Sequence, residues 1–192
     1  DSISARIINA AWDVGLDQRL LDDRLRLGAT WFFQRIDDFI AFTGNSVDNI
    51  DGESKIHGLE LEAGFDITSA LTLSASYTYT QAEDAGGDKL VRRPKHQASL
   101  DLGYRFLGDR ARLDASLLYG GGRDDYFYDA FYNQERVGLD SYTLINVGGS
   151  YRLLENVEIF GRVENVFDEN YEEVYTYGTP GRAGYAGLRI RL

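Results

Sequence analysis

Tyrosines and carboxylates gather in two polar segments of the chain, and these are the residues whose types could do chemistry. The segments are RDDYFYDAFYNQER (123–136) and FDENYEEVYTYGTP (167–180). Aromatic rings combined with polar anchors can hold a large ring-bearing ligand. The tyrosines that we expect to contact such a ligand are Tyr126, Tyr128, Tyr132, Tyr175 and Tyr177. The alternative is a surface hairpin whose aromatic side chains only extend an aromatic belt of the protein.

The remaining polar groups favour solvated surface over a catalytic or metal centre. The loop carboxylates are Asp124, Asp125, Asp129, Asp168 and Glu169. They could bind a hard divalent cation, but they lack the twelve-residue spacing of a calcium loop. The cationic segment VRRPKH (91–96) could contact phosphates of lipopolysaccharide or an anionic ligand, or could be a plain charged loop end. His57 and His96 are not spaced as a metal-binding pair. We therefore expect no catalytic residues, no metal site and no cofactor.

Composition narrows the class of protein. The 192 residues carry a net charge of -11 and are 43% hydrophobic, which argues against nucleic-acid binding. Without cysteine, neither a disulfide framework nor a thiolate zinc site can form. No apolar run is long enough for a transmembrane helix, whereas a barrel strand needs only about 9–11 alternating residues. The chain begins at Asp1 with no signal peptide, so we expect a processed or truncated chain or a fragment.

Apolar and polar residues alternate in segments along the whole chain, which is the period of a β-strand with one greasy face. In 71–80, Leu and aromatic residues occupy odd positions, and Ser and Thr occupy even ones. The strands predicted in this way are 11–18, 24–42, 55–66, 71–80, 97–106, 111–120, 142–153, 157–166 and 182–192. We expect the apolar face to contact lipid and the polar face, with charges of both signs in cross-strand pairs, to line a lumen.

The connections alternate between short and long. The short turns are 18–24, 66–70, 106–110 and 152–156, and the long polar loops are 43–54, 81–95, 121–140 and 167–181. Short periplasmic turns and long outer loops are typical of an outer-membrane barrel, whereas a soluble β-sandwich would bury its apolar faces in a shared core. Because bacterial barrels close with an even strand number, about nine strands must form part of a larger barrel, unless residues 2–10 supply part of another strand.

Several segments, read in order, resemble the C-terminal region of TonB-dependent outer-membrane receptors. They are LDDRLRLGATWFFQRIDDFIAF, KIHGLELEAGFDITSALTLSASYTYTQAED, RRPKHQASLDLGYRF, DSYTLINVGGSYRL and VEIFGRVENVFDENYEEVYTYGTPGRAGYAGLRIRL. The resemblance covers residues 11–192, and ENVFDENYEEV is its most specific part. Within that superfamily, YEEVYTYGTPGR is most similar to cobalamin receptors, with siderophore receptors close behind.

The resemblance implies an all-β, antiparallel transmembrane barrel of 22 strands, of which residues 1–192 form the C-terminal portion, without the N-terminal plug domain. It implies TonB-dependent uptake of cobalamin or a ferric siderophore across the outer membrane of a Gram-negative bacterium. The implied partners are outer-membrane lipid and lipopolysaccharide, the small-molecule ligand, and the TonB complex through the plug. The alternatives are a non-transporting barrel (an adhesin or a structural protein) and a barrel enzyme. We expect no enzymatic activity, because the residues show no nucleophile–base signature.

Overall fold

The computed structural model describes residues 8–43 and 46–191, and these parts of the chain form one nine-stranded sheet and a separate two-stranded hairpin. The strands are β1 (Ile8–Leu20), β2 (Leu25–Thr43), β3 (Ser46–Asp66), β4 (Leu71–Glu83), β5 (His96–Phe106), β6 (Ala111–Gly120), β7 (Arg123–Tyr128), β8 (Gln134–Leu139), β9 (Tyr142–Leu154), β10 (Val157–Glu164) and β11 (Ala183–Ile190). Neighbouring strands of the sheet are antiparallel, in the order β1-β2-β3-β4-β5-β6-β9-β10-β11. No helix in the described residues is long and apolar enough to cross a membrane.

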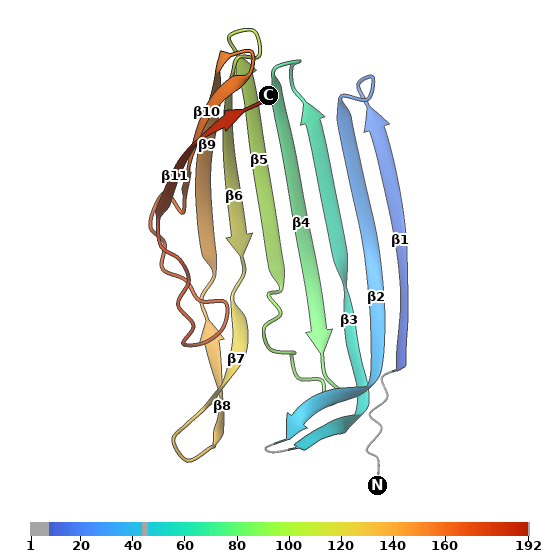
Figure 1. The fold of residues 1–192 in the computed structure, drawn as a ribbon. Helices are drawn as coiled ribbons and strands as arrows, with labels where there is room; N and C mark the ends of the chain where they lie inside the picture. The colour runs from blue at the N-terminus through green and yellow to red at the C-terminus, as the bar shows by residue number, and fades with distance from the viewer. Residues whose placement is uncertain (1–7, 44–45, 192) are drawn as a thin grey trace.

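The sheet is open, with β1 and β11 at the edges of its described part (Figure 1). The all-β antiparallel architecture and the nine predicted segments are confirmed, since each segment coincides with a strand of the sheet. Residues 8–10 extend β1 and form no additional strand, and residues 1–7 lie outside the described residues. The number of 22 strands for the complete barrel stays a prediction.

Short turns lie at one end of the sheet and long connections at the other, as the alternation predicted (Figure 1). The expected loop at 43–54 is wrong. There β2 continues to Thr43 and β3 begins at Ser46, so the two strands extend beyond the sheet as a paired hairpin. The expected loop at 121–140 contains the β7–β8 hairpin, which is paired from Arg123 with Leu139 to Tyr128 with Gln134.

The strand register places the apolar and polar residues on opposite faces. Leu16, Ala29, Leu61, Tyr77 and Ala98 are successive cross-strand neighbours on one face. On the other face the corresponding row is Asp17, Gly28, Glu62, Ser76 and Ser99. Large side chains of the apolar face are exposed in this chain, and no core covers them within the described residues, which excludes the soluble sandwich.

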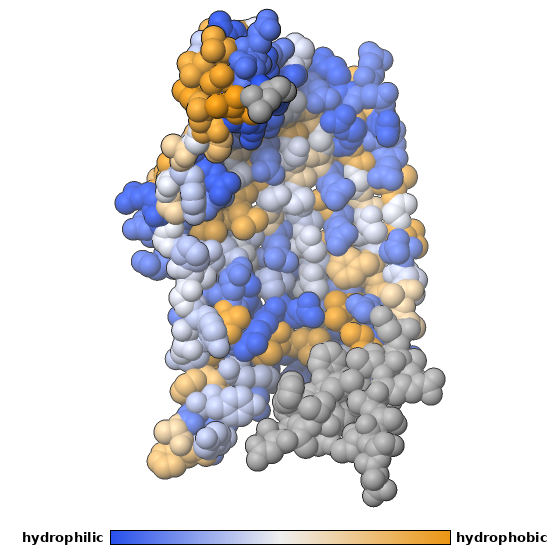
Figure 2. Space-filling view, in the orientation of Figure 1, coloured by the Kyte–Doolittle hydropathy of each residue, from blue (hydrophilic) through white to orange (hydrophobic). Residues whose placement is uncertain are grey.

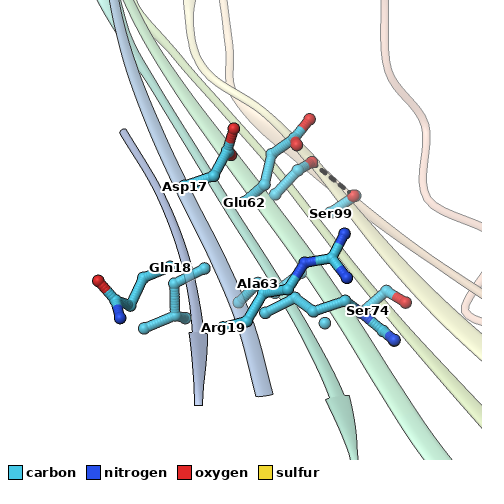
Figure 3. A pocket seen from close by; sticks show the side chains of 13 residues that line it. Asp17, Gln18, Arg19, Glu62, Ala63, Ser74 and Ser99 are labelled. Atoms are coloured by element: carbon cyan, nitrogen blue, oxygen red, sulfur yellow. Dashed lines mark hydrogen bonds between the residues drawn. The ribbon is translucent and has the colours of Figure 1, made fainter. Parts of the chain in front are cut away.

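The polar face lines a hollow of about 580 Å³ across β1 to β5, and Figure 2 shows hydrophilic side chains over the middle of this face. Asp17, Glu62 and Ser99 lie around the hollow in Figure 3, and the dashed line marks the hydrogen bond between Ser99 and Ser76 Oγ, at 2.8 Å.

The charges on the polar face pair in two ways. Glu158 and Arg189 pair across β10 and β11 at 2.7 Å, as expected. Other pairs join residues two apart on one strand, such as Arg112 with Asp114 at 2.6 Å. The expectation of cross-strand pairs therefore holds only in part, because side chains two apart on a strand share a face and are close enough to bond.

Aromatic rings form belts at both ends of the apolar face. Near the long connections Trp12 stacks on Phe33, with centroids 5.7 Å apart, and the Tyr77 hydroxyl lies 2.8 Å from His96 Nδ1. Near the short turns, Tyr104 stacks on Phe106 at 5.3 Å. Along β5, the eight residue steps from His96 to Tyr104 correspond to about 26 Å. Because the strands of such barrels are tilted by about 35–45°, this length corresponds to about 18–21 Å along the bilayer normal, which lies within the apolar band of about 25 Å.

Candidate functional site

Hydrogen bonds from two side chains hold both ends of the segment between β10 and β11. The two residues, Asn165 and Asp168, follow β10 directly. Asn165 is buried, and its Oδ1 accepts a hydrogen bond from the Glu169 N–H at 2.8 Å while its Nδ2 donates to the Glu169 carbonyl at 2.9 Å. Asp168 accepts a hydrogen bond from the Arg182 N–H at 2.7 Å, just before β11 begins. The segment is therefore a closed loop with a fixed base.

Asp125 of β7 joins this loop to two other segments. Its side chain is fully buried; Oδ2 accepts a hydrogen bond from the Tyr175 N–H at 2.8 Å, and Oδ1 accepts one from Arg92 Nε at 2.7 Å. Oδ1 also accepts the Tyr126 N–H at 2.8 Å. Burial alone would raise the pKa of this carboxyl, but the hydrogen bonds from the Tyr175 N–H, the Arg92 guanidinium and the Tyr126 N–H outweigh burial and keep the pKa below its usual value. Asp125 is thus a buried, charged anchor for the loops.

Aromatic and acidic contacts extend this anchor across the same surface. The Tyr142 hydroxyl donates a hydrogen bond to Glu173 Oε1 at 2.5 Å, and the Tyr142 and Tyr171 rings lie 4.3 Å apart between centroids. The Phe127 ring meets the Tyr175 ring edge-on at 5.4 Å. The hairpin and the 165–182 loop therefore pack as one cluster, which we call the loop cluster.

A cavity of about 410 Å³ lies within the loop cluster, between residues 138–141 and 170–179. Its lining includes the carboxylates Asp140 and Glu172 and the rings of Tyr171 and Tyr175. This combination offers aromatic contact and hydrogen-bonding groups to a small molecule, which is the usual make-up of a ligand pocket.

The structure separates the predicted ligand tyrosines into two groups. Tyr175 lines the cavity, and its ring is held against Phe127. The other four are exposed on the hairpin and the loop, from Tyr126 at 37% to Tyr132 at 87%. The exposed tyrosines are Tyr126, Tyr128, Tyr132 and Tyr177. The structure thus brings the two segments together but does not gather the five rings in one pocket.

Four of the five carboxylates considered as cation ligands, Asp124, Asp125, Asp129 and Asp168, accept hydrogen bonds from the protein. Asp124 accepts hydrogen bonds from Arg136 Nε and Nη2 at 3.0 and 2.8 Å. Asp129 accepts three hydrogen bonds, two from Asn133 and one from the Phe131 N–H, and the bond from the Asn133 side chain is the main reason why its pKa is lowered. Across the residues that the structure describes, no group of three or more His, Asp or Glu side chains is arranged to hold a metal ion.

Several residues of the loop cluster were not singled out by sequence reasoning. Asn165, Glu173 and Arg123 are the main ones. Glu173 and Arg123 contact residues of other segments, whereas the side chain of Asn165 bonds to Glu169 in its own loop. The sequence offered one indication that Asn165 matters. It is the first residue after β10 and belongs to ENVFDENYEEV, the most specific motif of the resemblance. Nothing in the local sequence indicates that Glu173 and Tyr142 meet, since they are 31 residues apart.

Comparisons with known proteins agree on one family. The family model "TonB dependent receptor-like, beta-barrel" matches residues 9–166. The chain is 36% identical over 166 residues to the vitamin B12 transporter BtuB of Photobacterium profundum and 26% identical over 177 residues to that of Vibrio cholerae. These matches cover 82% and 85% of the chain but 26% of each transporter, so the chain spans about a quarter of the length of these relatives.

Solved structures share the fold. The pyoverdine outer membrane receptor FpvA of Pseudomonas aeruginosa aligns with a TM-score of 0.81 and 20% identity, over 97% of this chain and 30% of the receptor. The ferric-catecholate import receptor Fiu of E. coli K12 aligns with a TM-score of 0.78 and 21% identity, over 96% of this chain and 27% of the receptor. The sheet has one apolar and one polar face, with short turns at one end and long connections at the other. Together with the family model and the curated relatives, this shows that the chain belongs to the TonB-dependent receptor β-barrel family of the Gram-negative outer membrane.

Proposed function

We propose that this chain forms part of the wall and outer loops of a receptor that imports a scarce nutrient, cobalamin or a ferric siderophore, with energy supplied through TonB. The observation that carries the proposal is the loop cluster, which holds a cavity and exposed tyrosines at the long-connection end of the sheet. In a barrel of this family that end faces the outside, where a nutrient arrives first. Cobalamin is the first candidate, because the curated relatives described above are named as vitamin B12 transporters.

In this proposal the residues have separate tasks. The exposed rings of Tyr128, Tyr132 and Tyr177 make the first contact with the ligand, and Tyr175 with its neighbouring carboxylates binds it at the cavity. The polar face then provides a hydrophilic wall for the lumen. We place the contact with TonB in the plug domain of the full-length receptor, outside the barrel wall.

The ferric siderophore remains the second candidate ligand. Its support is the shared fold, since the solved structures with this fold include receptors for pyoverdine and for ferric catecholates. The same surface of aromatic and polar groups can hold either a corrin ring or an aromatic chelate.

The test is ligand binding and uptake by cells that carry the full-length receptor, with labelled cobalamin and labelled ferric siderophores in parallel. One variant replaces the exposed tyrosines Tyr126, Tyr128, Tyr132 and Tyr177 by alanine, and a second carries Tyr175→Ala alone. We expect each to weaken binding of one of the two ligands by about tenfold or more, because buried or stacked tyrosines are frequent binding hot spots.

A matched control removes tyrosines of the apolar face near the short turns, with Tyr104→Ala and Tyr151→Ala together. The control variant should bind the ligand normally, because these residues pair near the short-turn end of the sheet, away from the loop cluster. If both loop variants reach the membrane in a folded form and bind cobalamin and siderophores with unchanged affinity, the proposed ligand surface is wrong.

A further inference from the structure

The cavity of the loop cluster has a lining of one charge sign. Asp140 lies in the connection between β8 and β9, and Glu172 lies in the 165–182 loop. Among the described residues that line this cavity, there is no lysine, arginine or histidine. The uncharged members of the lining are Gly138, Leu139, Ser141, Asn170, Tyr171, Tyr175, Gly178 and Thr179. A bound molecule therefore meets negatively charged acceptors beside polar and aromatic groups.

The two carboxylates of the lining are free to bind a ligand. In the part of the chain that the structure describes, the side chains of Asp140 and Glu172 take part in no hydrogen bond or ion pair. The adjacent Glu173 differs, because its Oε1 accepts the Tyr142 hydroxyl at 2.5 Å and lies 4.0 Å from Arg123 Nη1. An ionised carboxylate can only accept hydrogen bonds, so a ligand bound here must supply N–H or O–H donors.

Arginines of the neighbouring segments are paired with other carboxylates. Arg92 Nε donates to Asp125 Oδ1 at 2.7 Å. Arg136 Nη2 donates to Asp124 Oδ2 at 2.8 Å. These arginines do not line the cavity of the loop cluster, and their charge is compensated where they lie. The negative charge of the cavity lining is therefore not neutralised by them.

The segments that form the loop cluster also carry an excess of negative charge as a whole. Residues 123–140 contain two arginines and five acidic residues, and residues 167–182 contain one arginine and four acidic residues. A surface with one predominant sign of charge attracts ligands of the opposite sign and repels ligands of the same sign as they approach. An anionic ligand is thus disfavoured both on its approach and at the cavity.

We propose that Asp140 and Glu172 determine specificity, by binding a ligand that carries amide N–H donors and by excluding anionic chelates. The inference rests on the proposed function and deepens it, because it distinguishes the two candidate ligands. Cobalamin carries carboxamide groups around its corrin ring, whereas a ferric tris-catecholate carries negative charge on its oxygens. Amide donors form charge-assisted hydrogen bonds with the carboxylates, while the rings of Tyr171 and Tyr175 contact the apolar part of the corrin.

The experiment measures binding to the purified full-length receptor of cyanocobalamin and of its derivatives in which one peripheral amide is hydrolysed to a carboxylate. The variants are Asp140→Asn and Glu172→Gln, alone and together. We expect the parent to bind at least one derivative about tenfold more weakly than cyanocobalamin, because the new carboxylate is repelled by the lining. In the double variant, cyanocobalamin should bind about tenfold more weakly than to the parent, and the difference between the two probes should shrink to about threefold or less.

A matched control removes two charges from the outer end of the chain without changing the cavity. It combines Asp88→Asn and Glu135→Gln, at exposed residues that are not part of the cavity lining. The control should keep the difference between the two probes within about twofold of the parent value. Heat-modifiable migration checks that each variant is folded.

The outcomes separate this inference from the proposed function. A folded double variant that binds both probes as the parent does would overturn the inference, while the proposed function stands because cobalamin still binds. Binding of a ferric tris-catecholate by a parent that does not bind cobalamin would likewise overturn only the inference. A parent that binds neither cobalamin nor a ferric chelate would overturn both.

Discussion

Asp125 shows how much of the outer surface can depend on one side chain. It holds Arg92 of the β4–β5 connection and the backbone of Tyr175 in the β10–β11 loop. In addition, the Arg92 N–H donates to the Asp124 carbonyl at 2.7 Å, so the first of these links is doubled by a backbone bond. The link to Tyr175 has no such backbone support among the described contacts.

We expect Asp125→Ala to loosen the β10–β11 loop while the sheet remains folded. The change leaves the N–H groups of Tyr175 and Tyr126 without their acceptor, at a cost of about 1–3 kcal/mol for each donor that stays buried. Hydrogen exchange of the full-length receptor should therefore show faster exchange in residues 170–179. The control is Asp129→Ala, whose bonds remain within the hairpin tip. Unchanged exchange at 170–179 in Asp125→Ala would contradict the anchor role.

The same anchor should respond to acid. Because the pKa of Asp125 is lowered in the folded protein, its contribution to stability is complete above the usual carboxyl pKa of about 3.9. It is lost as the pH falls through the lower, folded-state pKa. The protection factors at 170–179, which compare the measured exchange with the intrinsic rate at the same pH, should thus fall between neutral and strongly acidic pH in the parent receptor. In Asp125→Asn this fall should be largely absent, since no carboxylate remains to be protonated.

Sequence reasoning singled out the two segments that pack together as the loop cluster, but not the contacts between them. The tyrosine-rich composition of 123–136 and 167–180 was enough to predict two outer loops with aromatic surfaces. The partners of Asp125 lie 33 and 50 residues away, at positions set by how the loops pack. No periodicity relates such residues, so three neighbouring carboxylates in one segment could not be told apart before the fold was known.

The alternation of apolar and polar residues correctly predicted the strands that have one apolar face. It failed at 43–54, where β2 and β3 extend beyond the sheet. The sequence GNSVDNIDGE carries polar residues at successive positions, so a hairpin without an apolar face has no period of two to show. The register shift between Asp37 and Phe39 marks the change from the sheet to this extension.

In two of the short turns, an arginine side chain donates a hydrogen bond to a backbone carbonyl of the neighbouring turn. Arg24 Nε donates to the Asp66 carbonyl at 3.0 Å, and Arg110 Nη2 donates to the Leu153 carbonyl at 3.2 Å. Each arginine ends a turn that starts with a leucine at positive φ, Leu21 in the first and Leu107 in the second. These side-chain bonds add to backbone bonds that link the same turns, from the Asp66 N–H to the Arg24 carbonyl at 2.8 Å and from the Arg152 N–H to the Arg110 carbonyl at 2.7 Å.

Removal of the terminal strand should prevent assembly of the barrel. β11 pairs along its whole length with β10, from Ala183 with Glu164 to Ile190 with Val157. Deleting residues 183–192 exposes the backbone groups of β10 to hydrocarbon, at several kcal/mol for each unpaired group. We expect the full-length receptor with this deletion to lose the heat-modifiable migration of a folded barrel.

The control deletion removes the tip of the β7–β8 hairpin, residues 129–133, which lies outside the nine-stranded sheet of the described chain. It should leave folding and membrane insertion intact. Heat-modifiable receptor after deletion of 183–192 would show that β11 is dispensable for closure.

At the scale of the whole molecule, the sheet can be read as a wall with a lipid side and a lumen side. Leu100 lies near the middle of β5 on the apolar face, and Asp101 follows it on the polar face. We expect Leu100→Arg to lower the free energy of unfolding in lipid vesicles by about 2–4 kcal/mol, the cost of a charge near the bilayer midplane. The measurement is denaturant unfolding of the full-length receptor.

Asp101→Arg is the matched control, one residue away and with a larger change in charge. It should have a much smaller effect on unfolding, because the polar face is hydrated and carries charges of both signs. Equal destabilisation by the two changes would mean that the assigned lipid face is wrong.

The hydrogen bonds at the base of the β10–β11 loop also affect which residues of such a receptor can change during evolution. Asn165 and Asp168 fix the β10–β11 loop where it leaves and rejoins the sheet, whereas the side chains of Tyr132 and Tyr177 are highly exposed at positions away from that base. Insertions and replacements at the tips therefore leave the support unchanged. Related receptors can thus vary the outer surface one tip at a time, while the barrel beneath keeps its shape.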